Sequence, residues 1–268
     1  MTLGLFDPAF LGGLVTTPAG YDPDAQAYIT AVETADGQAL ETGVRDAINA
    51  FVVGCKADGI WSAIKASCIL AGARTSNGAI VPLVGVAPTL VGSAGGWTYD
   101  RKNGITGNGT DNCLDSNRAN NSDPQDSAHV TFYIGQLGTG NGFFDNNTPT
   151  AARRTYYDVV TGGRGSINSS TLASGVGIPT GGFVGFNRSA SNAWQARVNG
   201  TTTARTTSSS STQSGTLLFQ ARRNPTTGVP EFIRNDAVSF YSIGESLNLD
   251  LLDARVSTLM SDFAAAIP

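Results

Sequence analysis

The sequence predicts a mainly β protein, an antiparallel sandwich of the jelly-roll kind, with helices near its N-terminus and one helix at its C-terminus. Short segments of alternating apolar and polar residues recur between residues 129 and 243. The 33 glycines, together with abundant Ser, Thr and Asn, supply turns between these segments. Helical spacing is confined to 22–72 and 246–267, so strands and helices do not alternate as a parallel sheet requires.

The charge and cysteine content exclude several classes of protein. A net charge of −4 with scattered basic residues argues against a nucleic-acid partner, and the apolar runs are too short to span a membrane. The three cysteines, Cys55, Cys68 and Cys113, form no CxxC motif, and the single His129 cannot complete a zinc site with them. We predict buried free thiols, consistent with synthesis in a reducing cytoplasm.

The chain begins with an apolar segment, residues 1–21, that has no helical or strand period because Pro and Gly interrupt it. We predict an extended arm that anchors the protein to another surface. The aromatic and aliphatic residues expected to make this contact are Phe6, Phe10, Leu11 and Leu14.

Residues 22–72 are predicted to form a small helical module of three helices. The first begins at Asp22-Pro23, where Asp caps the helix and Pro occupies its first turn, and it ends at Gly37. The second carries one apolar face from Leu40 to Cys55, and the third runs from about Trp61 to Leu70. Residues 73–96, rich in Gly and Pro, are interpreted as a linker and strand entry.

Residues 97–268 are predicted to form the sandwich. Strands are expected at 129–134, 183–186, 194–198 and 217–222, and Asn199-Gly200 indicates a tight hairpin turn into a strand at 201–205. The polar run 206–212 is expected to be a loop.

The last strand and helix organise this sandwich. Both faces of the segment 237–243 carry apolar residues, which predicts a central strand buried on both sides. After Gly244, either Ser246 or Asn248 can cap a helix. Its buried face is predicted from residues at helical spacing, which are Leu252, Val256, Leu259, Phe263 and Ile267.

Three motifs resemble the concanavalin A-like lectin/glucanase fold, in the laminin-G-like form found on bacteriophage virion proteins. They are Asn103-Gly-Ile-Thr-Gly-Asn-Gly-Thr110 followed by Asn112-Cys-Leu-Asp115, then Trp194 to Gly200, then Phe240-Tyr-Ser-Ile-Gly-Glu-Ser-Leu247. The resemblance covers roughly residues 97–268, and it departs from the family where Cys113 replaces the usual Tyr. The stretch 22–72 also resembles leader modules in structural proteins of tailed phages, cyanophages among them.

The resemblance implies a structural protein of a tailed-phage virion: a capsid-decorating or tail-attached appendage, of the tail-fibre or receptor-binding type. Its implied location is the virion. Its implied partners are other virion proteins, further copies of the chain (a trimer is favoured) and a host surface glycan. The alternative is a free carbohydrate-binding lectin, and a glycoside hydrolase is a remote third. We predict that the protein is not an enzyme, because its four glutamates form no E-x-D-x-E pattern and His129 lies in no nucleophile-elbow context.

Two candidate sites follow. Lectins stack aromatic side chains on sugar rings, and the candidates for that role are Trp97, Tyr99, Tyr156 and Tyr157. The alternative for each is packing in the core or at its edge. No cofactor is predicted except a calcium ion, for which Asp111, Asp115 and Asn117 could offer oxygens. Any polar turn has the same composition, so that alternative also remains open.

Overall fold

The computed structural model describes residues 20–145, 154–224 and 227–268 of the chain. The predicted arm residues Phe6, Phe10, Leu11 and Leu14 lie outside these ranges. The helices of the described part are α1 (Pro23–Asp36), α2 (Thr42–Ala57), α3 (Ser76–Ala79) and α4 (Leu249–Ala266), with short 3-10 turns at Trp61–Ala63, Ala94–Gly96 and Asn120–Ser122. No helix among the described residues is long and apolar enough to cross a membrane.

The first helix begins and ends where the sequence predicts; the second lies in the predicted stretch but begins at Thr42, after Leu40. The Asp22 side chain accepts a hydrogen bond from the Asp24 amide at the start of α1, and Gly37 ends this helix in the left-handed conformation. The apolar face of α2 is buried, and its Phe51 is only 2% exposed. These two predicted helices are confirmed.

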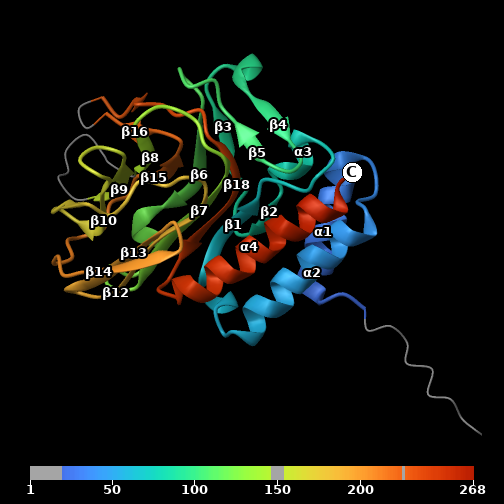
Figure 1. The fold of residues 1–268 in the computed structure, drawn as a ribbon, viewed down its shortest axis with the longest axis horizontal. Coiled ribbons are helices and arrows are strands. Elements are labelled where there is room, and N and C mark those ends of the chain that lie inside the picture. The colour runs from blue at the N-terminus through green and yellow to red at the C-terminus, as the bar shows by residue number, and fades with distance from the viewer. Residues whose placement is uncertain (1–19, 146–153, 225–226) are drawn as a thin grey trace, which may run out of the picture.

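A mainly antiparallel nine-stranded sheet runs through the middle of the molecule (Figure 1). Its strands, in spatial order, are β14 (Thr201–Arg205), β13 (Ala193–Val198), β12 (Gly182–Ala190), β7 (Ala128–Gln136), β18 (Ala237–Gly244), β1 (Ile64–Ile69) and β2 (Pro82–Val84). Two short strands extend it beside β18, namely β5 (Gly104–Thr106) and β4 (Thr98–Asp100). The hairpin between β13 and β14 turns at Asn199-Gly200, where both residues have positive φ, as predicted.

A second, seven-stranded sheet packs against one face of the first. Its order is β11 (Ala173–Ser174), β10 (Arg164–Ser169), β9 (Arg154–Asp158), β8 (Gly142–Asp145), β15 (Thr216–Phe219), β6 (Cys113–Ala119) and β3 (Thr89–Val91). A small hairpin joins β16 (Arg222–Arg223) to β17 (Pro230–Glu231). All of these pairings are antiparallel, so the predicted β-sandwich is confirmed.

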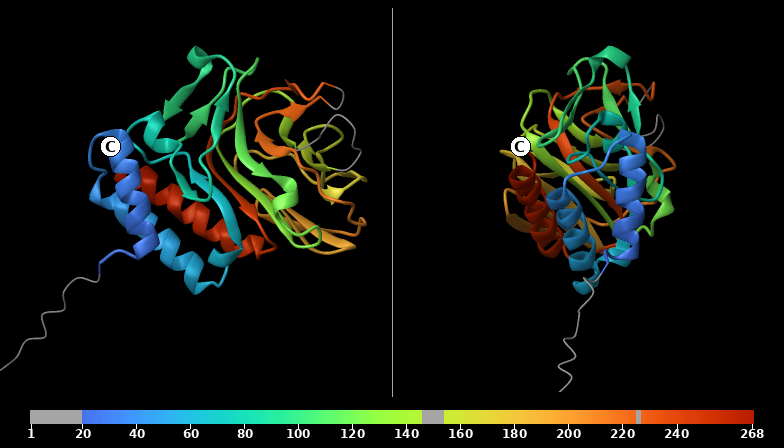
Figure 2. Two further views of the ribbon diagram at one scale, coloured as in Figure 1. Left: turned by 180° about the vertical axis from the view of Figure 1, so that it is seen from behind. Right: turned by 90° about the vertical axis from the view of Figure 1, so that its right-hand side faces the viewer.

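Strand β18 is the centre of the structure, as predicted. It pairs with β7 on one side and with β1 on the other, and every one of its residues is buried. Phe240 faces the helices and contacts Phe51 of α2 edge-on, with ring centroids 5.7 Å apart. Tyr241 faces the second sheet, where its ring lies 5.0 Å from that of Phe219. The molecule therefore has three layers, helices α1, α2 and α4, then the first sheet, then the second sheet (Figures 1 and 2).

Helix α4 closes the structure against the first sheet. Asn248 caps it by accepting from the amides of Asp250 and Leu251, which decides between the two predicted caps. The predicted apolar face is buried, with Leu252, Val256 and Phe263 fully so and Leu259 1% exposed.

The third predicted helix is wrong. Trp61–Ala63 is a 3-10 turn, and Ile64–Ile69 is strand β1, paired with β18. Both faces of this short segment are buried, and a buried apolar run of six residues has no period that separates a strand from a helix. Residues 22–72 therefore contain a strand and are not a purely helical module. Their buried residues also belong to the same hydrophobic core as those of the sandwich.

The three cysteines are free and buried, as predicted. Cys55 lies on α2, but Cys68 belongs to β1 rather than to a helix, and Cys113 opens β6. Burial raises the pKa of Cys55 and Cys113 to about 12 and raises the pKa of Cys68 further still.

Candidate functional site

Two of the four predicted sugar-stacking residues, Trp97 and Tyr99, line one groove. The groove measures about 390 Å³ and lies between β3, the 92–96 loop and strands β4 and β5. Its lining also includes Leu90, Ile105 and the exposed Thr98. We call this site the Trp97 groove.

The two aromatic side chains are half-buried, and that of Tyr99 is held by a hydrogen bond. The Tyr99 hydroxyl donates a 2.8 Å hydrogen bond to the Ala73 carbonyl, and burial raises the pKa of this phenol, so it stays neutral. Ile105, which is 1% exposed, pairs with Val238 of the central strand. The buried indole Nε1 of Trp97 has no hydrogen-bond partner in the described structure. Both rings are partly exposed and line the groove, and stacking on a sugar uses the face of such a ring.

The loop beside the groove is shaped by a close contact at Gly96. A Cβ added there would lie 2.0 Å from Oδ1 of Asn112, so only glycine fits. Asn112 is fully buried and donates its amide to the Ser93 carbonyl at 2.9 Å, which ties the loop to the start of β6. The loop is therefore anchored by Asn112, which the sequence analysis did not identify. The adjacent pair Gly95-Gly96 could have indicated a close contact in this loop.

Asp111 supplies a fixed negative charge behind this loop. Its carboxylate accepts from the Ser93 hydroxyl at 2.5 Å and from the Asn108 amide at 2.6 Å. These hydrogen bonds, of which the one from Ser93 has the largest effect, hold the pKa of Asp111 below its usual value. Asp111 is thus ionised at neutral pH and helps to fix the 92–96 loop, but it does not line the groove.

The other two predicted stacking residues are corrected by the structure. Tyr156 and Tyr157 lie on β9, a strand with neighbours on both sides, and they are 1% and 0% exposed. The Tyr157 ring stacks on Phe143 with centroids 4.7 Å apart, and its hydroxyl donates to the Gly177 carbonyl. Both rings are packed in the core and cannot stack on a sugar, although Tyr156 also lines a small pocket at the end of the second sheet.

The predicted calcium ligands are also corrected. Asp115 pairs with Arg223 at 3.2 Å and accepts from Thr216 at 2.8 Å, whereas Asp111 faces Ser93 and Asn108. Asn117 donates its amide to the Ala87 carbonyl and to Thr89. The oxygens of the two aspartates are thus bound by different neighbours, and the described residues contain no group of three or more His, Cys, Asp or Glu placed around a metal.

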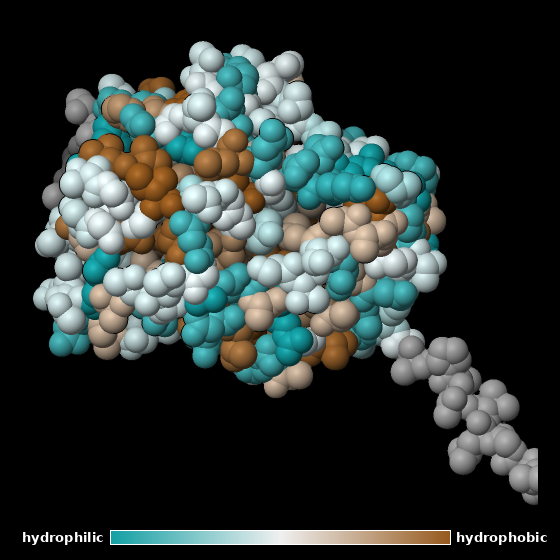
Figure 3. Space-filling model, viewed as in Figure 1, coloured by the Kyte–Doolittle hydropathy of each residue, from teal (hydrophilic) through white to brown (hydrophobic). Residues whose placement is uncertain are grey.

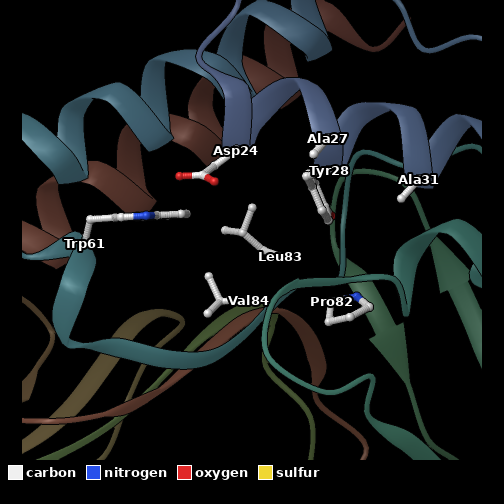
Figure 4. Close-up of a pocket in the computed structure, with 8 residues that line it drawn as sticks. All are labelled: Asp24, Ala27, Tyr28, Ala31, Trp61, Pro82, Leu83 and Val84. Carbon is white, nitrogen blue, oxygen red and sulfur yellow. The ribbon is translucent and has the colours of Figure 1, made fainter.

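A second groove of about 380 Å³ lies between α1 and the edge strand β2 (Figure 4). Trp61 points across the gap, with Leu83 and Val84 below it and Ala27 on the helix above. The Lys56 ammonium lies 5.7 Å from the centre of the Trp61 ring. This lining is almost wholly apolar, with Asp24 as its one charged member, so it offers few partners for a polar ligand.

No glutamate of the chain is placed as a general acid. All four are ion-paired: Glu33 with Arg45, Glu41 with Arg74 and Arg101, Glu231 with Arg222, and Glu245 with Lys65. The hydrogen bond from Arg101 lowers the pKa of Glu41. A general acid requires the opposite shift.

His129 is fully buried in β7, with its ring nitrogens at 2.6 Å from the Glu245 carbonyl and 2.8 Å from the Ser242 hydroxyl. Burial lowers the pKa of this imidazole to about 4. A neutral, enclosed histidine of this kind has a structural role.

Neither a family model nor a curated protein matches this sequence. Several solved structures are similar in fold. Domain 4 of a GH43 extracellular arabinanase from Geobacillus stearothermophilus, in complex with arabinotriose, is 15% identical with a TM-score of 0.39, over 62% of this chain and 87% of that one.

Two further solved structures are similar in fold. The CBM40 of a Ruminococcus gnavus sialidase, bound to α2,3-sialyllactose, is 8% identical with a TM-score of 0.35, over 49% of this chain and 82% of that one. The binding domain of botulinum neurotoxin serotype D is 10% identical with a TM-score of 0.45, over 73% of this chain and 50% of that one. At these TM-scores the likeness gives no information on what this chain binds.

Proposed function

We propose that the protein is a carbohydrate-binding module and that the Trp97 groove is its binding site. The observation that carries the proposal is the pairing of Trp97 and Tyr99 in one solvent-open groove with a polar rim. Sugars combine apolar ring faces with hydroxyl groups, so they match a surface of aromatic side chains bordered by hydrogen-bonding groups.

The polar groups around the groove support the same ligand class. Thr98 and Ser76 line it and are exposed, so each offers a hydroxyl that can both donate and accept. A purely apolar ligand would leave these groups unpaired, and a polyhydroxylated one would not.

We further propose that binding is not followed by hydrolysis. A retaining glycosidase needs two carboxyl groups about 5 Å apart, one of them with a raised pKa. No aspartate or glutamate lines the Trp97 groove, and the nearby Asp111 has a lowered pKa. Incubation of the protein with any oligosaccharide it binds should release no reducing ends.

The test is a pair of matched tryptophan variants. The wild-type chain is screened against immobilised polysaccharides, and affinity for each positive is then measured by calorimetry. Trp97→Ala should weaken binding by about tenfold or more, since one aromatic contact contributes roughly 0.5–1.5 kcal/mol beyond the area that it buries.

The control is Trp61→Ala, which removes another half-buried tryptophan from a groove on the helical side. It should bind as wild type does. Equal loss in both variants, or unchanged affinity in Trp97→Ala, would refute the assignment of the site.

The finer proposal, a virion appendage of a tailed phage, rests on the motif resemblance and on the apolar sequence of residues 1–21. In this role the module would present its groove to a host surface glycan, while the arm would attach it to other virion proteins. Mass spectrometry of purified particles should find the chain at fixed copy number, and deletion of residues 1–21 should abolish incorporation without unfolding the sandwich. Loading of the truncated chain at normal copy number would contradict this role.

The same role implies a homo-oligomer, with a trimer favoured. Sedimentation equilibrium at micromolar concentration measures this directly. A monomer under these conditions would contradict the prediction.

A further inference from the structure

We propose a second ligand site, for a single neutral sugar ring, at the end of the second sheet. A pocket of about 100 Å³ opens there between β8, the turn from β9 to β10, and the β16–β17 hairpin. We call it the Phe232 pocket. Its main lining residues are Asn141, Tyr156, Asp158, Arg164, Arg222 and Phe232.

Phe232 is the first unusual feature of this pocket. It is 46% exposed, although it is a large aromatic residue, and its backbone has φ of +54°. A bulky side chain in this conformation is a true outlier, and such backbone strain is concentrated at ligand-binding and catalytic sites. The Phe232 carbonyl accepts from the Gly142 amide at 3.1 Å, which holds the strained residue against β8.

The ring of Phe232 is presented as a platform. The Arg222 guanidinium carbon lies 4.2 Å from the ring centre, so the cation covers one face of the ring and a ligand would stack on the other. Val160, which is 38% exposed, lines the same pocket. Figure 3 shows hydrophobic surface gathered over this part of the sandwich, around β8 and β16.

The inner wall of the pocket is polar and already ordered. Arg164 donates from Nη2 to the Asp158 carboxylate at 2.5 Å and from Nε at 3.2 Å, and the Tyr156 hydroxyl donates to the same carboxylate. Arg222 is bound in turn to Glu231, with a 3.0 Å hydrogen bond from Nε. Burial and the hydrogen bond to Asp158 raise the pKa of Tyr156 to about 12, so its hydroxyl keeps its proton.

The charges of this wall select the class of ligand. Two guanidinium groups face two carboxylates, Asp158 and Glu231, so the pocket has no surplus charge. An anionic ligand needs an excess of cationic donors, which is absent among these side chains. Adjacent hydroxyl groups each donate and accept, so a vicinal diol matches a wall that offers both guanidinium donors and carboxylate acceptors. An apolar sugar face over Phe232 and hydroxyls on the wall complete the fit.

The Phe232 pocket is separate from the Trp97 groove. The first is built on the second sheet and the β16–β17 hairpin, and the second is built on β3, β4 and β5 (Figure 1). The pocket has roughly a quarter of the volume of the groove, about 100 Å³ against 390 Å³, so it suits one terminal ring rather than a chain of sugars. This inference does not depend on the ligand of the Trp97 groove.

The experiment uses the full chain carrying Trp97→Ala, so that the groove does not contribute. Saturation-transfer NMR is recorded with the methyl glycosides of glucose, galactose and mannose, and with methyl glucuronide as the anionic counterpart. At least one neutral glycoside should bind. Adding Phe232→Asn should weaken it about tenfold, since an aromatic contact is lost. Asparagine tolerates positive φ, so the melting temperature should stay the same or rise.

A second variant, Asn141→Ala, removes an exposed amide from the rim and should weaken binding severalfold without affecting the fold. The proposal is overturned if no neutral glycoside binds to the Trp97→Ala chain, if Phe232→Asn leaves binding unchanged, or if methyl glucuronide binds more tightly than methyl glucoside. If the Trp97 groove does not bind carbohydrate, a different result shows it: Trp97→Ala would then bind polysaccharides with wild-type affinity.

Discussion

Phe240→Ala should be among the most destabilising single substitutions in this chain. The ring is fully buried on the central strand and contacts Phe51 of α2 edge-on at 5.7 Å, so it joins the helical layer to the sheet. Its removal forfeits about 2–3 kcal/mol of hydrophobic transfer free energy. A residual cavity of roughly 80 Å³ would cost about 2 kcal/mol more, at about 24 cal/mol per Å³.

The expected total of about 4–5 kcal/mol lies at the upper end of the range for Phe→Ala in cores. In a chain of this size it lowers the melting temperature by roughly 10 °C or more. Calorimetry and urea unfolding measure both quantities. Tyr28→Ala is the comparison: Tyr28 is 5% exposed but also lines the groove between α1 and β2, so water can fill the space. It should cost less.

The reasoning is refuted if Phe240→Ala melts as wild type does. That result would mean that α2 and the sheet adjust to fill the space, or that β18 is peripheral. A larger loss in Tyr28→Ala than in Phe240→Ala would equally contradict the central place given to β18.

Three further predictions concern pH, capping and thiol reactivity. Burial lowers the folded-state pKa of His129 from 6.5 to about 4, so between these pH values the unfolded chain takes up a proton that the folded chain does not. The free energy of unfolding should therefore fall by up to about 3 kcal/mol as pH drops from 6.5 to 4. In urea titrations, His129→Gln should reduce this dependence on pH. Asn248→Ala should cost about 1 kcal/mol by removing the cap of α4, and Asn248→Asp should restore most of it; equal melting of all three proteins would contradict the capping role. All three thiols should resist a disulfide reagent at pH 8 until the chain is unfolded, because each is buried with a raised pKa; rapid labelling of native protein would show that the core opens.

Patterns within a single segment predicted most of the fold. Asp22 and Gly37 bound α1 through interactions with their own neighbours, and Asn199-Gly200 closes its hairpin through its own backbone preferences. The strand Ile64–Ile69 was missed because its identity depends on pairing with β18, about 175 residues further along the chain. A local period cannot report a partner at that distance.

The candidate sites were predictable only in part, for the same reason. From the sequence alone, Trp97 and Tyr157 are equally plausible as sugar-stacking residues. They differ in burial, and Tyr157 is buried because β9 has a neighbouring strand on each side. The Phe232 pocket gave no signal, because the positive φ of Phe232 and its contact with Arg222 both arise from tertiary packing. The Asp111, Asp115 and Asn117 set had suitable composition, but the neighbours of each side chain determine what its oxygens bind.

The arrangement of the core explains why binding and stability should be separable in this protein. The Trp97 groove is joined to the central strand through Ile105, which pairs with Val238, whereas Phe240 contacts Phe51 in the helical layer. The Phe232 pocket lies on the second sheet, where its charged groups are paired with one another rather than with the core. Substitutions on the surfaces of the two sites therefore remove ligand contacts without opening a cavity beside β18. Substitution of Phe240 does the reverse: the strands that hold both sites remain paired, while the helical layer loses the contact between Phe240 and Phe51.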